Sequence, residues 1–361
     1  MSSDSSAKPS FGGRFDRLLE LVGEGGADGI LVTSAANRRY LSGFTGSSAG
    51  LVISTGQSIL VTDGRYITQA SAECPDFEIV RHTGPILRQI AESVLQTNMR
   101  RLAFDPALTT VADHRALAAA LDGGCELVEA TGLVESLRSV KNSHELRLMR
   151  RAIALADEVM AIVEDIVEPG VREIDVAVEI ERAFREGGAE GPSFPVIVAA
   201  GVNSAMPHHR PARKVIERGE PVVVDMGALV AGYCSDMTRT FCAGGRTKVF
   251  DSVYDVVLEA QLAAIDGARD GLAARECDRL ARARIEQAGF GERFGHGTGH
   301  GIGLEVHESP RVAATSTDTL RTGMVHSIEP GIYLPEWGGV RIEDLVLVGE
   351  DGAEVLSTYR K

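Results

Sequence analysis

The sequence predicts an α/β (α+β) protein of two domains, and three observations lead to this prediction. The chain has 361 residues, of which 44% are hydrophobic and 24% charged, an ordinary globular composition in a chain long enough for two domains. In roughly the first 134 residues, short apolar runs alternate with stretches of helical spacing, which indicates a small α/β domain. Further along, a pattern of helices followed by a β-hairpin occurs twice, which indicates an internal duplication with a pseudo-two-fold axis.

The N-terminal part of the chain is expected to hold a tail and the smaller domain. Residues 1–11 are small and polar and lack the apolar core of a signal peptide, so they predict a disordered tail. Asn142 and Glu145 have the spacing of a capping box that begins a new helix, so the first domain is placed at residues 12–136 and the second at 137–361. In the first domain we expect helices at residues 14–22, 86–95 and 112–121, and strands at residues 29–33, 51–54 and 59–62.

Each predicted hairpin of the second domain carries two carboxylates at matching places. In PVVVDMGALVAGYCSDMTRTF an apolar strand ends at Asp225, and the returning strand carries Asp236. In HSIEPGIYLPEWGGVRIEDLVLV, Glu329 and Glu343 occupy the corresponding positions. Each half of the duplication is therefore expected to bring two carboxylates to one shared centre. The hairpins span residues 221–241 and 326–348, preceded by helical patterns at 145–167 with 173–186 and at 251–269 with 276–287.

Four converging carboxylates need cations or protons between them. Two unit charges about 4 Å apart interact by roughly 4 kcal/mol at an effective dielectric near 20. Two divalent ions would neutralise the four carboxylates, and one neutral imidazole would complete a ligand set that suits manganese, cobalt or zinc. The glycine-rich stretch FGHGTGHGIGLEVHE between the hairpins offers His296, His300 and His307. The alternative is a mobile surface loop beside surface carboxylates, but four carboxylates at matched positions favour the metal centre.

These segments resemble the pita-bread metallopeptidases, the family of Xaa-Pro aminopeptidases, prolidases and methionine aminopeptidases. The resemblance runs from about Ser139 to the end of the chain with the motifs in order, and SAMPHHRP resembles the proline-directed members. FTGSSAG followed by TDGRY is typical of the small N-terminal domain of Xaa-Pro aminopeptidases. The resemblance implies a creatinase-like α/β N-terminal domain, a catalytic pita-bread domain and a homodimer. The metal ligands that it implies are Asp225, Asp236, His300, Glu329 and Glu343.

The resemblance also implies roles for residues around the ligands. His208 matches the family histidine that contacts the substrate, and His307 matches the one that holds the substrate carbonyl or the developing oxyanion. Glu329, besides being a ligand, is expected to pass a proton to the leaving proline nitrogen. Arg341 lies on one strand face with Glu343, so we expect it to orient the carboxylates.

Three further histidines are expected to lie outside the reacting centre or are left open. His209 follows His208 directly and would point away from the site in an extended segment. His326 faces away from Glu329 by strand alternation, so it is expected to be a packing residue. For His296, structural support of the glycine loop and contact with the substrate both stay open.

The predicted function is that of a dinuclear metal-dependent aminopeptidase that hydrolyses the Xaa-Pro bond at the N-terminus of peptides through a metal-bridging hydroxide. Mn²⁺ is the expected ion, with Co²⁺ or Zn²⁺ as alternatives. The nearest alternative is a prolidase, an Xaa-Pro dipeptidase with the same ligands, although FTGSSAG and TDGRY favour the aminopeptidase. A metal-free amidinohydrolase of the creatinase type and a non-catalytic binding module are disfavoured because no ligand is missing.

Charge and cysteine content restrict the partners and the compartment. The net charge of −14 disfavours binding to nucleic acid or to an anionic membrane, and no segment approaches the apolar length of a membrane span. The five cysteines are scattered without a CxxC motif, which favours a reducing cytoplasm. We therefore expect a cytoplasmic enzyme whose partners are peptides with proline at the second position.

Overall fold

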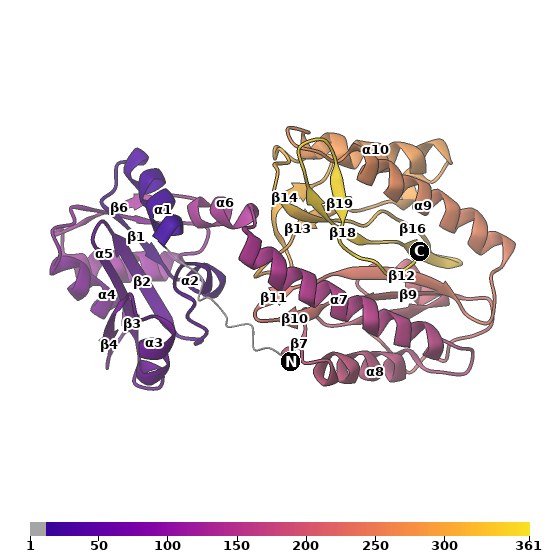
Figure 1. Ribbon diagram of the computed structural model, residues 1–361, viewed down its shortest axis with the longest axis horizontal. Coiled ribbons are helices and arrows are strands. Elements are labelled where there is room, and N and C mark those ends of the chain that lie inside the picture. Colours follow the sequence, from indigo (N-terminus) through magenta and orange to yellow (C-terminus); the bar gives the residue numbers. More distant parts are fainter. Residues whose placement is uncertain (1–11) are drawn as a thin grey trace. The chain divides into compact units, whose positions relative to one another are not determined.

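The computed structural model of the protein describes residues 12–361 (Figure 1). The tail predicted for residues 1–11 lies outside the described residues. The chain divides into two compact units, Met1–Arg138 and Ser139–Lys361. Among residues 12–361, no helix is both long enough and apolar enough to cross a bilayer.

The N-terminal unit is built on a mixed sheet with the strand order β4-β3-β2-β1-β5-β6. The strands predicted at residues 29–33, 51–54 and 59–62 are confirmed, as are the three predicted helices. Leu31, Ile90, Leu102 and Leu117 join the helices to the sheet in one buried core. The strands are β1 (Gly29–Val32), β2 (Ala49–Ser54), β3 (Gln57–Thr62), β4 (Glu78–Arg81), β5 (Arg101–Phe104) and β6 (Glu126–Glu129). The helices are α1 (Gly12–Glu24), α2 (Ala35–Ser42), α3 (Ile67–Glu73), α4 (Ile86–Leu95), α5 (Val111–Leu121) and α6 (Leu133–Ser139).

The C-terminal unit repeats one motif, a pair of helices followed by strands. The first pair is α7 (Ser143–Ile166) and α8 (Glu173–Glu186), and the second is α9 (Lys248–Gly267) and α10 (Ala274–Gln287). Figure 1 shows α7 and α8 on one side of the strands and α9 and α10 on the other. The predicted capping box begins α7, since the Asn142 side chain accepts from the Glu145 amide at 3.0 Å and Glu145 Oε2 accepts from the Asn142 amide at 3.1 Å.

The strands of the C-terminal unit follow the predicted hairpins. In the first half they pair in the order β12-β9-β8, and in the second in the order β14-β13-β15-β18-β19, with β16 paired to β17. The first-half strands are β7 (Gly191–Pro192), β8 (Ile197–Ala200), β9 (Pro221–Met226), β10 (Ala228–Val230), β11 (Tyr233–Cys234) and β12 (Met237–Cys242). The second-half strands are β13 (Gly299–Gly301), β14 (Glu308–Val312), β15 (Val325–Ile328), β16 (Gly331–Leu334), β17 (Gly338–Arg341), β18 (Asp344–Val348) and β19 (Ala353–Val355). The short 3-10 helices are η1 (Gly201–Ala205) and η2 (Gly291–Arg293).

The two halves join where β12 meets the segment between β17 and β18. The Glu343 amide donates to the Thr238 carbonyl at 3.1 Å. Thr240 Oγ1 donates to the Arg341 carbonyl at 2.8 Å and accepts from the Arg341 amide at 3.0 Å. Each half has its own apolar core, one between α7, α8 and β9 and the other between α9, α10 and β15. The strands that meet at this seam therefore lie between two packed layers.

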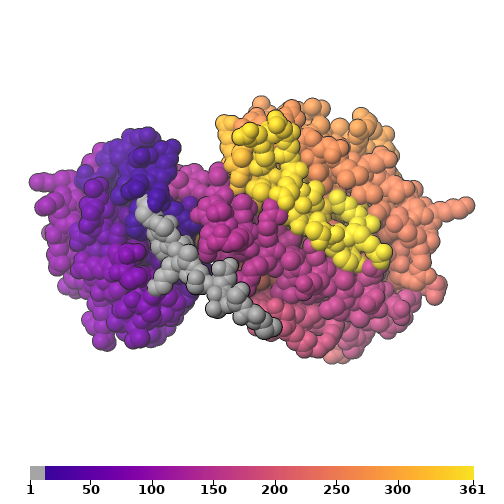
Figure 2. Space-filling view, in the orientation of Figure 1, coloured from indigo at the N-terminus to yellow at the C-terminus, as the bar shows by residue number. Residues whose placement is uncertain are grey.

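The C-terminal residues brace the same strands from outside. The buried Arg239 guanidinium donates to the carbonyls of Tyr359 and Arg360 and to Asp344 Oδ1. On the other side, Asp157 of α7 accepts from the amide of Tyr359 at 2.9 Å. Figure 2 shows this end of the chain, in yellow, as a surface band between magenta segments of the first half and orange segments of the second.

Candidate metal centre

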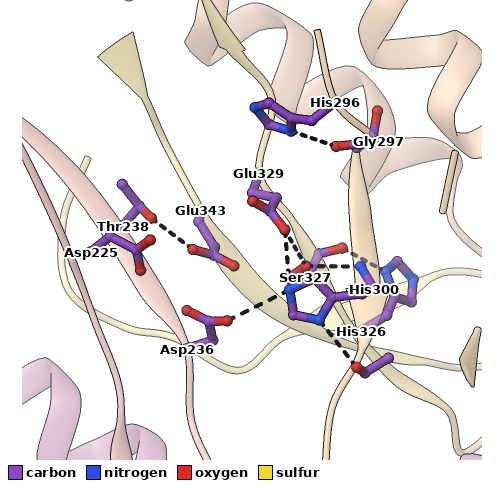
Figure 3. A network of polar contacts seen from close by, with 12 residues as sticks. Asp225, Asp236, Thr238, His296, Gly297, His300, His326, Ser327, Glu329 and Glu343 are labelled. Carbon is purple, nitrogen blue, oxygen red and sulfur yellow. Dashed lines mark hydrogen bonds and ion pairs between the residues drawn. The ribbon is translucent and has the colours of Figure 1, made fainter. Parts of the chain in front are cut away.

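The seam between the halves gathers the predicted carboxylates and one histidine (Figure 3). Asp225 lies in β9, where it is in register with Thr238 of β12, and Asp236 immediately precedes β12. Glu329 directly follows β15, and Glu343 directly precedes β18.

The ligand atoms of Asp236, Glu343 and His300 of β13 lie within 4.8 Å of one another. His300 Nε2 is 3.7 Å from Asp236 Oδ2 and 3.2 Å from Glu329 Oε1.

Three buried carboxylate oxygens at this centre have no hydrogen-bond partner within residues 12–361. They are Oδ1 of Asp225, Oδ1 of Asp236 and Oε1 of Glu343. Buried polar atoms are normally paired, because a buried acceptor without a donor costs free energy. Anionic oxygens beside an imidazole form the donor set that divalent cations such as manganese or zinc accept. The residues present therefore fit a metal centre.

The pKa values of these groups show how poorly the protein alone neutralises them. Burial, together with the charges of neighbouring carboxylates, raises the pKa of Asp236 and of Glu343 well above the usual range. Burial also raises the pKa of Asp225, although Arg341 opposes this effect. An acid with a raised pKa is an acid whose charged form lacks partners, so cations would stabilise the ionised centre.

His300 and Glu329 form a charge pair within the centre. Burial on its own would lower the pKa of His300, but the hydrogen bond and the charge of Glu329 raise it to about 9. Burial on its own would raise the pKa of Glu329, but His300 holds it at about 2. Ser327 sets this pair, because its hydroxyl accepts from the His300 amide at 3.0 Å and donates to Glu329 Oε1 at 3.1 Å. Ser327 was not predicted from the sequence, although by strand alternation it shares a face with Glu329.

Arg341 orients the carboxylates, as its predicted place on the strand face suggested. Its guanidinium donates to Asp225 Oδ2 at 2.6 Å and to the Tyr333 hydroxyl at 3.0 Å. It also donates to Thr238 Oγ1 at 3.2 Å, and Thr238 in turn donates to Glu343 Oε2 at 2.7 Å. The Arg341 guanidinium therefore holds one oxygen of Asp225 directly and one oxygen of Glu343 through Thr238. The other oxygen of each carboxylate has no hydrogen-bond partner within residues 12–361.

His296, which the sequence left open, has both ring nitrogens engaged by the protein. The Tyr333 oxygen accepts from Arg341, so its own proton is available to His296 Nε2 at 2.8 Å. His296 Nδ1 then donates to the Gly297 carbonyl at 2.8 Å. Burial lowers the pKa of His296, which keeps it neutral in this arrangement. This geometry favours structural support of the glycine loop.

A cavity of about 780 Å³ opens onto the centre, a size suited to a small peptide. His208 and His307 both line it, and the His307 ring centroid is 4.3 Å from that of His300. Burial, followed by the nearby His300, lowers the pKa of His307, which therefore favours the neutral imidazole at pH 7. The apolar side chains of the lining are those of Phe194, Pro195, Ile197, Pro207, Val306 and Ala313.

Two arginines in the cavity lining were not predicted from the sequence as site residues. Arg210 follows the two histidines of SAMPHHRP, and Arg311 lies in β14. Arg311 is paired with His300 across the antiparallel β13–β14 ladder, so its side chain is on the same face as the histidine. A register shift between His300 and Gly301 sets this pairing, and nothing in the sequence pattern indicates that shift.

His326 lies as the strand pattern predicted, whereas His209, which was expected to point away from the site, lines the cavity. His326 is fully buried, its Nδ1 is 2.9 Å from the Ser327 carbonyl, and burial lowers its pKa to about 4. His209 turns its Nε2 to the buried carboxylate of Glu173 at 2.9 Å.

Two protein-family models match successive parts of the chain. The model of metallopeptidase family M24 matches residues 147–350, and that of the creatinase/prolidase N-terminal domain matches residues 14–140. A solved Xaa-Pro dipeptidase from Bacillus anthracis is 41% identical with a TM-score of 0.94, over 98% of this chain and 99% of that chain. A solved X-Pro aminopeptidase from Thermotoga maritima is 35% identical with a TM-score of 0.90, over 96% and 98%. An Xaa-Pro dipeptidase from Pyrococcus horikoshii is 35% identical over 94% of this chain and 95% of that protein.

Proposed function

The chain belongs to metallopeptidase family M24, and on this premise we propose that it is an aminopeptidase that removes the N-terminal residue preceding proline. The family makes it a hydrolase that uses divalent metal and acts on peptides. Its creatinase-like N-terminal domain and pita-bread C-terminal domain are those that the sequence motifs predicted. The observation that carries the proposal is the set of buried carboxylate oxygens around His300 that have no hydrogen-bond partner within residues 12–361, in the lining of a peptide-sized cavity.

We propose that two divalent ions, most suitably Mn²⁺, are held at this seam. Ions held there would lower the pKa of an attacking water and polarise the scissile carbonyl. Support for the ligand assignment comes from the free oxygens, the raised pKa values of two of the acids and the cluster around His300. The proposed ligands are Asp225, Asp236, His300, Glu329 and Glu343.

The protein's own groups would handle the charge and the protons of the reaction. His208 and His307 line the cavity, where an N–H from each can donate to the oxyanion that forms at the scissile carbonyl. Proline nitrogen in a peptide bond carries no hydrogen, so it must receive a proton as it leaves. Glu329, whose side chain lines the same cavity, is the proposed carrier of that proton from the attacking water to the nitrogen.

A dipeptidase is the second candidate, and the two cavity arginines favour it. A dipeptide presents its C-terminal carboxylate close to the scissile bond, and a guanidinium binds a carboxylate through two parallel hydrogen bonds. Arg210 and Arg311 are placed in the lining to do this. The relatives carry both names, dipeptidase and aminopeptidase, so substrate length is the property that separates the two candidates.

Substrate length can be tested with manganese-loaded enzyme, an Xaa-Pro dipeptide and an Xaa-Pro-Xaa tripeptide. We expect hydrolysis of the tripeptide at the Xaa-Pro bond, measured as release of the free N-terminal residue. Hydrolysis of the dipeptide alone, with a KM that rises at least about tenfold in Arg311→Ala, would replace the aminopeptidase by the dipeptidase. Hydrolysis of neither peptide by enzyme with two bound ions would reject proline specificity.

Metal affinity is expected to increase with pH between about pH 6 and pH 9. Ligands bind as the deprotonated form, and in the metal-free protein His300 has a pKa of about 9 while those of Asp236 and Glu343 are raised. Ions must displace these protons, so raising the pH removes a competitor. Calorimetric titrations of Mn²⁺ at one pH, in buffers with different ionisation enthalpies, should show net proton release. Binding without proton release would contradict this protonation pattern.

We also propose a cytoplasmic location and a homodimer. All five cysteines fall within the described residues and none of them forms a disulfide there, which suits a reducing compartment. The homodimer rests on the family resemblance alone.

A further inference from the structure

A buried glutamate behind the active-site cavity accepts hydrogen bonds from four groups of one segment. Glu173 lies in the first turn of α8 and is 0% exposed. Its Oε1 accepts from the Ala200 amide at 2.8 Å and from Asn203 Nδ2 at 2.9 Å. Its Oε2 accepts from the Ala212 amide at 3.0 Å and lies 2.9 Å from His209 Nε2. The four partners come from the last residue of β8 and from the stretch that connects β8 to β9.

A carboxylate is rarely buried this fully unless its surroundings replace water. Four donors fill the acceptor capacity of the two oxygens, and the N-terminal end of α8 adds a favourable dipole. Removal of any one donor, or of the carboxylate, would leave buried polar groups unpaired. Because a shift of Ala200, Asn203, His209 or Ala212 would break a buried hydrogen bond, Glu173 fixes the position of the segment that contains them.

The tethered segment carries a histidine that the protein does not hold directly. His208 lines the cavity, and its side chain makes no hydrogen bond to residues 12–361. Its position is therefore set by the backbone on either side. Further contacts hold the preceding part, since Ser204 Oγ accepts from the Gly339 amide at 2.7 Å and the Pro207 carbonyl accepts from Arg341 at 3.4 Å. On the following side, His209 and Ala212 are held by Glu173.

We propose that Glu173 is a positioning residue for the reaction, which acts through His209 and the backbone to aim His208 at the reacting carbonyl. This inference rests on the proposed role of His208 in oxyanion stabilisation. It gives a function to His209, the second histidine of SAMPHHRP, whose Nε2 lies 2.9 Å from Glu173 Oε2. It also explains why a charged side chain is kept in the interior, at a distance in sequence from every proposed ligand.

The test compares Glu173→Gln with a matched control on metal-loaded full-length protein. Glutamine keeps the shape but places an NH₂ group where one oxygen accepted, so either the Ala200 amide or the Ala212 amide loses its acceptor. Asp175→Asn removes the same charge from the same helix turn, but Asp175 is exposed and pairs with Arg172. We expect Glu173→Gln to keep both ions, to increase amide hydrogen exchange in residues 198–214 and to lower kcat about 10- to 100-fold with a smaller effect on KM. Asp175→Asn should change none of these.

A double mutant distinguishes positioning from general destabilisation. His208→Ala should keep its metal and lose rate. In that background Glu173→Gln should lower kcat less than about threefold further, because the group that it positions is already absent. An equal loss of kcat in both backgrounds, or unchanged hydrogen exchange in Glu173→Gln, would overturn the proposal. Exchange does not depend on turnover, so failure of the wild-type protein to cleave Xaa-Pro peptides would instead reject the proposed function.

Discussion

Replacing Asp236 with alanine is expected to lower kcat/KM by at least about 10³-fold and to leave fewer than two divalent ions bound per chain. Asp236 is 5% exposed, and its ligand atoms lie within 4.8 Å of those of His300 and Glu343. Loss of this carboxylate removes both a negative charge and a metal ligand from the centre. Metal content after gel filtration, measured by atomic emission, and steady-state hydrolysis of an Xaa-Pro-Xaa peptide check the two parts of the prediction.

Asp175→Ala is a suitable control, because this exposed aspartate of the same unit pairs only with Arg172 in the described residues. It should keep both ions and full activity. Normal turnover by Asp236→Ala with two ions bound would reject the two-ion centre proposed at the seam.

Replacing Arg341 with alanine is expected to reduce the free energy of unfolding of the metal-free protein by about 3–5 kcal/mol. Arg341 is 3% exposed, and its removal leaves Asp225 as an unpaired buried charge and Tyr333 without its donor. The carboxylates would also lose their orientation, which should weaken metal binding by about 10- to 100-fold. Urea unfolding in the presence of a chelator and calorimetric titration with Mn²⁺ measure the two effects separately.

Two controls set the scale of the Arg341 result. Arg341→Lys keeps the charge but replaces a planar fork by a single ammonium, so it should recover only part of the loss. Arg150→Ala removes an exposed arginine paired with Glu354 and should change stability by no more than about 1 kcal/mol. Wild-type stability and metal affinity in Arg341→Ala would show that Arg341 does not support the carboxylates.

Features encoded by local patterns were predictable from the sequence. The capping box at Asn142 fixed the beginning of α7, and apolar periodicity located both helix pairs of the C-terminal unit. The repeated hairpin pattern matched Asp225 and Asp236 with Glu329 and Glu343, so their convergence could be predicted without a structure. By contrast, β4, β5 and β6 were missed because charged residues stand at one or both ends of each four-residue strand, whereas β1, of the same length, is uncharged throughout.

Features encoded by distant pairings were not predictable from the sequence. Glu173 occupies the first turn of a helix, where an acidic residue is ordinarily a solvated partner of the helix dipole. Its burial depends on donors that lie 27 to 39 residues further along the chain. Arg311 reaches the cavity only because an irregular ladder pairs it with His300. In both cases the deciding information is register, which residue type and spacing do not specify.

The duplication also bears on how the site distinguishes the two ends of a peptide. A peptide has a direction, whereas a centre made of two identical halves would look the same when it is turned around. Each half contributes one pair of carboxylates, but His300, Arg341 and Ser327 come from the second half alone. His208 and its Glu173 support come from the first half alone. Polarity is therefore carried by the residues in which the halves differ, and changes confined to those residues are the ones that would reverse or blur the choice of peptide end.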